Sequence, residues 1–539
     1  ATGAIRPGDI AVCGDTIVST DAADRRGTRE IDGRGRIAAP GFIDTHVHVE
    51  SSMVTPAEFE RAVLPRGTTT AICDPHEMAN VLGAEAIRWF LRASEALVMT
   101  LRVNLSSCVP ATTLETAGAR LEAADLLALA GHPAVLGLAE VMSFPAVLAK
   151  DEGVLAKLAA FAGRHIDGHA PLLQGRPLDA YLATGIRTDH ECTKLEEAQE
   201  KLAKGMHVLM REGTVAKNVT ALAPLLTDLT WMRLAFCTDD RNPLEIAEEG
   251  HIDAAIRKAI RAGAPSIAAY RAASLGAALA FGLADRGVLA PGYRADIVLL
   301  DDLEEVAVGD VICGGRPVEP ALFAGRTHPD PVGYGSVRRP RISADELAVP
   351  ARAGPTPVIG VVPFSLITER QEAVLPVVSG RRVADPERGI MKVCVLERHG
   401  VNGNIGKGFA TGFGRLRGAI AGSVGHDSHN LTVVGDDDGD MAAAVNRLIE
   451  LQGGFAVVQG GEVLAELPLP IAGLMSDKGS AFVRERLHGL KTAARAIGCA
   501  LDEPFIQLAF VPLPVIPHLK LTDRGLVAAG PDGLHLIEG

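Results

Sequence analysis

The sequence predicts an α/β protein whose largest part is a (β/α)8 barrel. Between residues 37 and 240, short β-rich runs alternate with longer segments in which apolar residues recur at helical spacing. Each β-rich run ends in polar side chains, and barrels of this kind carry their chemistry at the strand ends. A doubly wound open sheet would need a glycine-rich phosphate turn after its first strand, and none stands there. The eight strand ends are His46/His48, Asp74/His76, Asn104, Glu140, His169, His190, Arg211 and Asp239.

The first of these strands ends in two histidines, His46 and His48. Successive strand side chains point to opposite faces, so histidines at i and i+2 point the same way. Neutral imidazole is the commonest metal-binding side chain, and the pair therefore indicates a metal site. On its own a two-residue motif matches often by chance, and a pair of partly exposed loop histidines explains it equally well.

Helices are expected between the strands at residues 81–96, 153–163, 194–204 and 218–227, and the barrel as a whole at 37–285. Two β-rich pieces flank it, residues 1–36 and 286–350, and we expect them to pair into one small split β-sandwich domain. Residues 325–357 are rich in Pro, Arg and Gly, which indicates a linker.

A third domain of the α/β class is expected over residues 351–539. Its strand-like runs lie at 392–396 and 455–458, and its helical runs lie at 441–451 and 481–497.

Composition excludes several classes of function. The chain has 539 residues, a net charge of −13 and no cluster of Lys and Arg, so we expect no nucleic acid partner. Its eight cysteines form no CxxC pair, which is typical of reduced thiols in a cytoplasmic protein. Neither a long apolar run nor a leader pattern is present, so no membrane segment is expected. The expected partners are a small-molecule substrate and a second copy of the chain in a homodimer.

Six of the strand-end side chains together could bind metal. Each alone has an ordinary explanation, because buried histidines are usually hydrogen-bonded and a terminal Asp often caps a helix. Four histidines and two carboxylates at corresponding positions are enough to hold two divalent metal ions with one carboxylate bridging. The set is His46, His48, Glu140, His169, His190 and Asp239.

The residues from Gly41 to His48 and from Gly292 to Val298 resemble the amidohydrolase superfamily, in which a split β domain flanks the barrel. Further segments are similar to adenine deaminases of the bacterial type, and this similarity covers essentially the whole chain. Much of the superfamily bridges its metals with a carboxylated lysine, whereas this chain has Glu140, which matches the deaminases and argues against hydantoinase-like members. The segments are 48–52, 73–80, 139–142, 167–171, 188–193, 238–241 and 425–430.

The resemblance implies hydrolysis of adenine to hypoxanthine and ammonia by a metal-activated hydroxide, a step of purine salvage. It points to Mn(II) or Fe(II), and Zn(II) also suits His and carboxylate ligands. Attack at C6 requires a proton at N1 and another on the leaving amine. We expect Asp239 to move the hydroxide proton to the amine and Glu77 to protonate N1, with Glu191 as the reserve. Glu77 could instead be a helix-start carboxylate that the macrodipole favours.

Substrate binding is expected of residues beside the metals and of the segment 425–430, a candidate lid over the site. Such residues are also ordinary turn formers, so a solvated loop is the alternative. The expected substrate-binding residues are Asp74, His76, Asp240, Asp427, Ser428 and His429.

Two other functions stay open. Another dinuclear amidohydrolase could act on a cyclic amide or a different aminated heterocycle, because metal ligands set the reaction type better than the substrate. A non-catalytic metal-binding or assembly protein is less favoured, since a closed structural site has no use for extra carboxylates such as Glu77 and Asp240.

Overall fold

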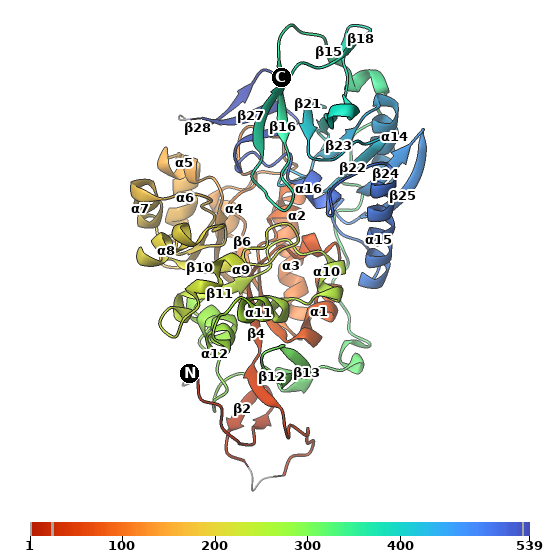
Figure 1. The fold of residues 1–539 in the computed structure, drawn as a ribbon. Helices are drawn as coiled ribbons and strands as arrows, with labels where there is room; N and C mark the ends of the chain where they lie inside the picture. Colours follow the sequence, from red (N-terminus) through yellow and green to blue (C-terminus); the bar gives the residue numbers. More distant parts are fainter. Residues whose placement is uncertain (1–2, 23–25, 531–532) are drawn as a thin grey trace.

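The computed structural model describes residues 3–22, 26–530 and 533–539. The molecule has three parts, which lie one after another along its length: a small β region, a central α/β body and a C-terminal region built on a large sheet (Figure 1). The parts of the predicted first and third domains at 1–2, 23–25 and 531–532 lie outside the described residues.

The central body contains eight strands that are paired in parallel and in sequence order. The first five form one sheet, in the order β4-β5-β6-β7-β8, and the last three form a second, in the order β11-β10-β9. The strands are β4 (Phe42–Val47), β5 (Thr68–Cys73), β6 (Thr100–Leu105), β7 (Val135–Val141), β8 (His165–Gly168), β9 (Thr188–Asp189), β10 (His207–Arg211) and β11 (Leu234–Cys237).

The last strand of this body returns to the first. Val47 and Asp239 form a parallel bridge, and the His48 amide donates to the Asp239 carbonyl over 3.1 Å. Between β8 and β9, the Arg187 amide donates to the Ile166 carbonyl over 3.3 Å. A curled parallel α/β arrangement is thus confirmed, while the closed eight-stranded barrel stays a prediction.

Two of the four predicted helices of this body match single helices, α6 (Glu152–Ala160) and α8 (Leu195–Ala203). The predicted helix at 81–96 is divided at Gly83, whose φ of 65° breaks the helix into α2 (His76–Leu82) and α3 (Ala84–Ala96). The one predicted at 218–227 is an α-helical turn that continues as a 3-10 helix at Ala223–Leu225, which contains Pro224. The remaining helices here are α1 (Pro56–Val63), α4 (Ala123–Leu127), α5 (Phe144–Leu148), α7 (Gly175–Ala183), α9 (Val219–Leu222), α10 (Pro243–Glu248), α11 (Ile252–Arg261), α12 (Ser266–Arg271) and α13 (Ala277–Ala280).

The small β region combines segments from both sides of the central body. One sheet has the order β14-β13-β12-β3, and a hairpin of β1 and β2 joins it through a bridge between Thr16 and Arg294. The hairpin packs against the sheet through a small buried cluster that includes Ile17, Ala295 and Ile297. The strands are β1 (Ala11–Cys13), β2 (Thr16–Ser19), β3 (Ile37–Pro40), β12 (Ile297–Asp302), β13 (Ala307–Cys313) and β14 (Arg316–Pro317).

The C-terminal region is built on a sheet with the order β17-β16-β21-β20-β23-β22-β24-β25, in which only β16 and β21 pair in parallel. Its predicted helices correspond to α14 (Asp438–Leu451) and α15 (Ser480–Ala496), and α16 (Pro504–Ala509) follows. From the predicted linker, Val337, Ile342 and Leu347 pack into the same core as α14. The sheet strands are β16 (Thr356–Gly360), β17 (Glu369–Ala373), β20 (Met391–Leu396), β21 (Ile405–Thr411), β22 (Ala419–Gly422), β23 (Leu431–Gly435), β24 (Gly454–Gln459) and β25 (Glu462–Pro468).

Two smaller sheets complete this region. One has the order β15-β19-β18 and the other the order β26-β27-β28. Their strands are β15 (Val349–Pro350), β18 (Val377–Val378), β19 (Arg381–Arg382), β26 (Leu519–Thr522), β27 (Gly525–Gly530) and β28 (Gly533–Ile537).

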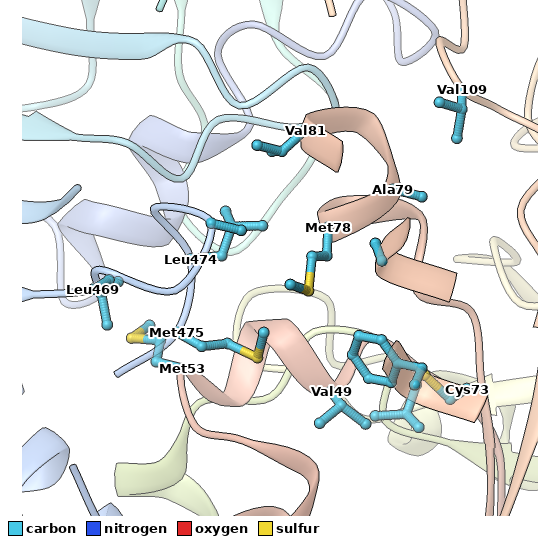
Figure 2. Packing of buried hydrophobic residues seen from close by; sticks show 14 of the residues in the cluster. Val49, Met53, Cys73, Met78, Ala79, Val81, Val109, Leu469, Leu474 and Met475 are labelled. Carbon is cyan, nitrogen blue, oxygen red and sulfur yellow. The ribbon is translucent and has the colours of Figure 1, made fainter. Parts of the chain in front are cut away.

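The central body and the C-terminal region share one hydrophobic core. Met53 and Met78 belong to the same buried cluster as Leu474 and Met475 (Figure 2). The Ser476 amide also donates to the Met53 carbonyl over 2.8 Å. The C-terminal region is therefore packed against the segments that follow β4 and β5.

All eight cysteines are unpaired. No helix in the described ranges combines the length and the apolar character that a membrane crossing requires.

Candidate active site

The six predicted metal ligands lie together at the carboxyl ends of the parallel strands. His46 is near the end of β4 and Glu140 near the end of β7, while the other four directly follow or stand close behind their strands. None of the six is more than 5% exposed. We call this group the Glu140 cluster: His46, His48, Glu140, His169, His190 and Asp239.

The Glu140 carboxylate is at the centre of this cluster. Its Oε1 lies 3.4 Å from His46 Nε2 and 3.3 Å from His48 Nε2. Its Oε2 lies 2.7 Å from His169 Nδ1 and 3.4 Å from His190 Nε2. Each oxygen thus faces a different pair of imidazoles, which is the arrangement expected of a carboxylate between two cations.

Asp239 follows β11 and connects the cluster to a buried arginine. Its Oδ1 lies 3.0 Å from His48 Nε2, and its Oδ2 accepts a hydrogen bond of 2.6 Å from Arg211 Nη1. The second nitrogen of Arg211 donates to Glu191 Oε2 over 2.9 Å. Despite burial, Arg211 holds the pKa of Asp239 well below its ordinary value. The sequence indicated Arg211 as a strand end but not as a member of the site.

The backbone and Asp74 orient the histidines. His48 Nδ1 donates to the Asp74 carbonyl over 2.9 Å, and this contact directs His48 Nε2 towards Glu140 and Asp239. The Asp74 carboxylate lies 2.9 Å from His76 Nδ1 and accepts from Ser106 Oγ over 2.8 Å. Asp74 therefore holds His76 beside Glu140, whose Oε1 lies 3.5 Å from His76 Nδ1.

The cluster favours positive charge. Burial opposes protonation of His48, yet Asp239 and Glu140 raise its pKa well above its ordinary value. Burial likewise opposes ionisation of Glu140, yet His190 and His46 lower its pKa well below the ordinary value. His169 Nε2 is buried without a hydrogen-bond partner among the described residues. Free imidazole nitrogens beside ionised carboxylates are the donor set of a divalent metal site, so the residues present fit a metal.

A second group of side chains adjoins the first and joins α2 to the C-terminal region. Glu77 Oε2 accepts a hydrogen bond from His429 Nε2. Its Oε1 lies 2.7 Å from His426 Nδ1 and 3.2 Å from His76 Nε2. Asp427 Oδ1 lies 3.8 Å from His76 Nε2. We call His76, Glu77, His426, Asp427 and His429 the Glu77 cluster.

Two of the predicted substrate-binding residues have other partners. Ser428 Oγ donates to Glu115 Oε2 over 2.7 Å, and the Asp240 carboxylate accepts from Ser51 Oγ. Burial and the neighbouring Asp239 raise the pKa of Asp240. Glu115 was missed because its loop carries no periodic pattern, whereas His426 was visible within the 425–430 segment but was not singled out.

Comparisons with known proteins identify the family of this chain. Residues 37–318 match the amidohydrolase family, and residues 365–530 match the adenine deaminase C-terminal domain. An adenine deaminase from Methylobacterium nodulans is 62% identical over 527 residues, which cover 98% of this chain and 93% of the relative. The chain belongs to the adenine deaminase family.

Other members of the adenine deaminase family show similar values. The enzyme of Gluconobacter oxydans is 59% identical and adenine deaminase 1 of Rhizobium meliloti is 57% identical, each over 98% of this chain and 93% of the relative. Among solved structures, N-acetyl-D-glucosamine-6-phosphate deacetylase from Mycobacterium smegmatis aligns with a TM-score of 0.43 and 19% identity, over 58% of this chain and 96% of that one.

Proposed function

We propose that the chain hydrolyses adenine to hypoxanthine and ammonia at the Glu140 cluster. Membership of the adenine deaminase family supports the substrate. The observation that supports a metal-dependent active site here is the position of Glu140, whose two oxygens face separate pairs of imidazoles.

Two divalent ions would fit this cluster, Mn(II) or Fe(II) in the first place and Zn(II) in the second. His46, His48 and Asp239 would hold one, His169 and His190 the other, and Glu140 would contact both. Bound there, the metals would lower the pKa of a water molecule and so supply the nucleophile near neutral pH.

We also propose that β4 to β11 close into a barrel within residues 37–285. The bridge between Val47 and Asp239 supports this closure. The split β-sandwich domain would then comprise residues 1–36 and 286–350, and the C-terminal α/β domain residues 351–539. A closed barrel explains why side chains from five different strands meet in the Glu140 cluster.

Asp239 is suited to move a proton between the attacking water and the leaving amine. Arg211 occupies its Oδ2, while Oδ1 points to His48. Because the carboxylate is ionised, it can accept a proton. It can then return that proton to the amino group at C6, which has to leave as ammonia.

The proton for N1 has two candidate donors, Glu77 and Glu191. Burial opposes their ionisation, but Arg211 lowers the pKa of Glu191, and His426 lowers the pKa of Glu77 well below its ordinary value. We expect Glu77→Gln and Glu191→Gln to separate them. Replacement of the residue that protonates N1 should lower kcat by roughly two to four orders of magnitude.

The test is ammonia release by the metal-loaded full chain from adenine, other aminated purines and pyrimidines, and cyclic amides. We expect adenine to be preferred, with one hypoxanthine formed per ammonia. Glu140→Gln, purified in the same way, shows whether a contaminant produces the signal. Preferred opening of a cyclic amide, or preferred deamination of another heterocycle, would contradict the proposed function.

A further inference from the structure

We propose that the Glu77 cluster binds a further divalent cation through His76 Nε2, Glu77 Oε1, His426 Nδ1 and Asp427 Oδ1. This site is distinct from the Glu140 cluster, and the inference does not depend on which substrate the chain hydrolyses. It rests on ligand geometry, hydrogen-bond direction and charge.

The ligand atoms have the spacing of a metal site. Ligands held about 2.1 Å from one metal ion lie roughly 3.0 to 3.4 Å apart at octahedral or tetrahedral angles. Here Glu77 Oε1 lies 3.2 Å from His76 Nε2 and 2.7 Å from His426 Nδ1. Asp427 Oδ1 lies 3.8 Å from His76 Nε2 and 3.7 Å from His426 Nδ1. Each of the two carboxylate oxygens thus lies within 4 Å of both imidazole nitrogens, at distances that bracket the range expected for ligands of one ion.

The contacts at Glu77 Oε1 are short ion-pair distances rather than well-aligned hydrogen bonds. Although two imidazole nitrogens lie close to Glu77 Oε1, this oxygen has no hydrogen-bond partner within the described residues. Asp427 Oδ2 is also buried without a partner in that part of the chain. Nitrogens near an oxygen but not directed at it are expected when their lone pairs point at a third atom, a metal.

The other Glu77 oxygen is oriented as in known metal sites. The Gly425 amide donates to His429 Nδ1 over 3.2 Å, so the ring proton of His429 is on Nε2. This N–H donates to Glu77 Oε2 and keeps the carboxylate ionised. A hydrogen bond of this kind fixes a metal-binding carboxylate and supports its affinity.

The acidic side chains around this cluster would favour a cation. Glu77 and Asp427 are each 1% exposed, and three more buried carboxylates, Glu50, Glu115 and Asp240, are near them. In the described ranges no Lys or Arg forms an ion pair with any of the five. Buried carboxylates are expensive unless they are paired or bind a metal.

The donor set indicates the kind of ion and its effect. Two or more imidazoles with carboxylates suit Mn(II), Fe(II), Co(II) or Zn(II), and the buried thiol of Cys108 lies within 4.8 Å of the ligand atoms of His76 and Asp427. The ion would tie α2 to the segment 426–429. If the cation is bound, Glu77 is engaged by it and by His429, and Glu191 is then the remaining candidate donor for N1.

The test is a titration of the metal-free full chain with Mn(II), in which electron paramagnetic resonance measures the free ion at each step. We expect one more bound Mn(II) per chain in the unaltered protein than in Asp427→Asn or His426→Asn. His535→Asn removes an exposed imidazole on β28, and this variant should bind as many ions as the unaltered protein.

Glu140→Gln separates this site from the proposed active site. It should lose ions at the Glu140 cluster and retain the ion at Glu77, whatever substrate the enzyme uses. Circular dichroism checks the fold of each variant, and the nearly isosteric Glu77→Gln gives the same readout from a third position. If Asp427→Asn, His426→Asn or Glu77→Gln is folded and binds as many ions as the unaltered chain, there is no such site.

Discussion

The Glu140 and Glu77 clusters each surround one buried carboxylate with imidazoles, but the chain builds them in different ways. Every member of the first cluster comes from a strand end between residues 46 and 239. The second joins Glu77 to His429, which stand 352 positions apart in sequence. Parallel strand topology thus assembles the first cluster, whereas the second exists only where two regions of the molecule pack against each other.

This difference shows which contacts each cluster depends on. The segment at 426–429 is held by Arg398, a buried arginine that donates to the His429 carbonyl and, over 2.8 Å, to the Ala472 carbonyl. Ala472 belongs to the core shared with Met53. Changes in the C-terminal region should therefore affect the Glu77 cluster and leave the metal ions at Glu140 in place.

Glu140→Gln should have the largest effect. Gln has one carbonyl oxygen and no charge, so it cannot serve two cations, and the Glu140 cluster should lose metal together with most of its activity. We expect this variant to have a lower kcat than Asp239→Asn and His429→Ala. Metal analysis and an ammonia assay on the same sample check this, and a Glu140→Gln enzyme with full metal content would contradict the assigned bridge.

Asp239→Asn should have the next largest effect. Arg211 can still donate to the amide oxygen of Asn, so the local fold and most of the metal should remain. The proton-transfer group is lost, and we expect kcat to fall by roughly two to four orders of magnitude. Steady-state rates together with metal content measure this, and a near-native rate would remove Asp239 from the proton path.

His429→Ala should have a moderate effect that is confined to the Glu77 cluster. It removes the hydrogen bond to Glu77 Oε2, and loss of a group that orients a metal ligand usually costs about 10- to 100-fold in affinity or activity. We expect kcat/KM to fall by that factor while the metal at Glu140 is unchanged. Loss of the Glu140 metals in His429→Ala would show that the two clusters are not independent.

The comparison also explains how much the sequence could predict. The convergence of five residues could be predicted because each ends a recognisable strand, and the carboxyl ends of successive parallel strands lie on one side. They are His46, His48, Glu140, His169 and His190. The α/β class followed from the same alternation. The sparse pairing between β8 and β9 could not be predicted, because no local pattern reports how neighbouring strands pair.

Residues that act across the two regions were harder to find. Glu115 lies in an irregular stretch and meets Ser428 only because the C-terminal region packs there. The predicted helix 81–96 breaks at Gly83, and a contact from a distant segment forms beside this break. The Gly118 amide donates to the Asn80 carbonyl over 2.8 Å at the end of α2. Sequence periodicity reports on one element at a time and contains no such contacts.

The smallest expected effect concerns stability and its dependence on pH at the contact between the two regions. Burial, with a contribution from Asp427, raises the pKa of Glu115 from its ordinary 4.5 to about 8. The unfolded chain ionises this group above pH 4.5, whereas the folded chain keeps it protonated up to about pH 8. Stability due to Glu115 therefore falls as pH rises through this window.

Glu115→Gln should remove this loss, because Gln is uncharged at every pH. For the metal-free chain we expect little change in the free energy of unfolding at pH 4.5 and a gain of at most about 5 kcal/mol at pH 8, given about 1.4 kcal/mol per pKa unit between 4.5 and about 8. Denaturant unfolding at both values measures it, with the exposed Glu485→Gln as control. With Mn(II) bound the gain should shrink, since a cation at Asp427 favours ionised Glu115. An equal gain with and without Mn(II) would count against a cation beside Asp427.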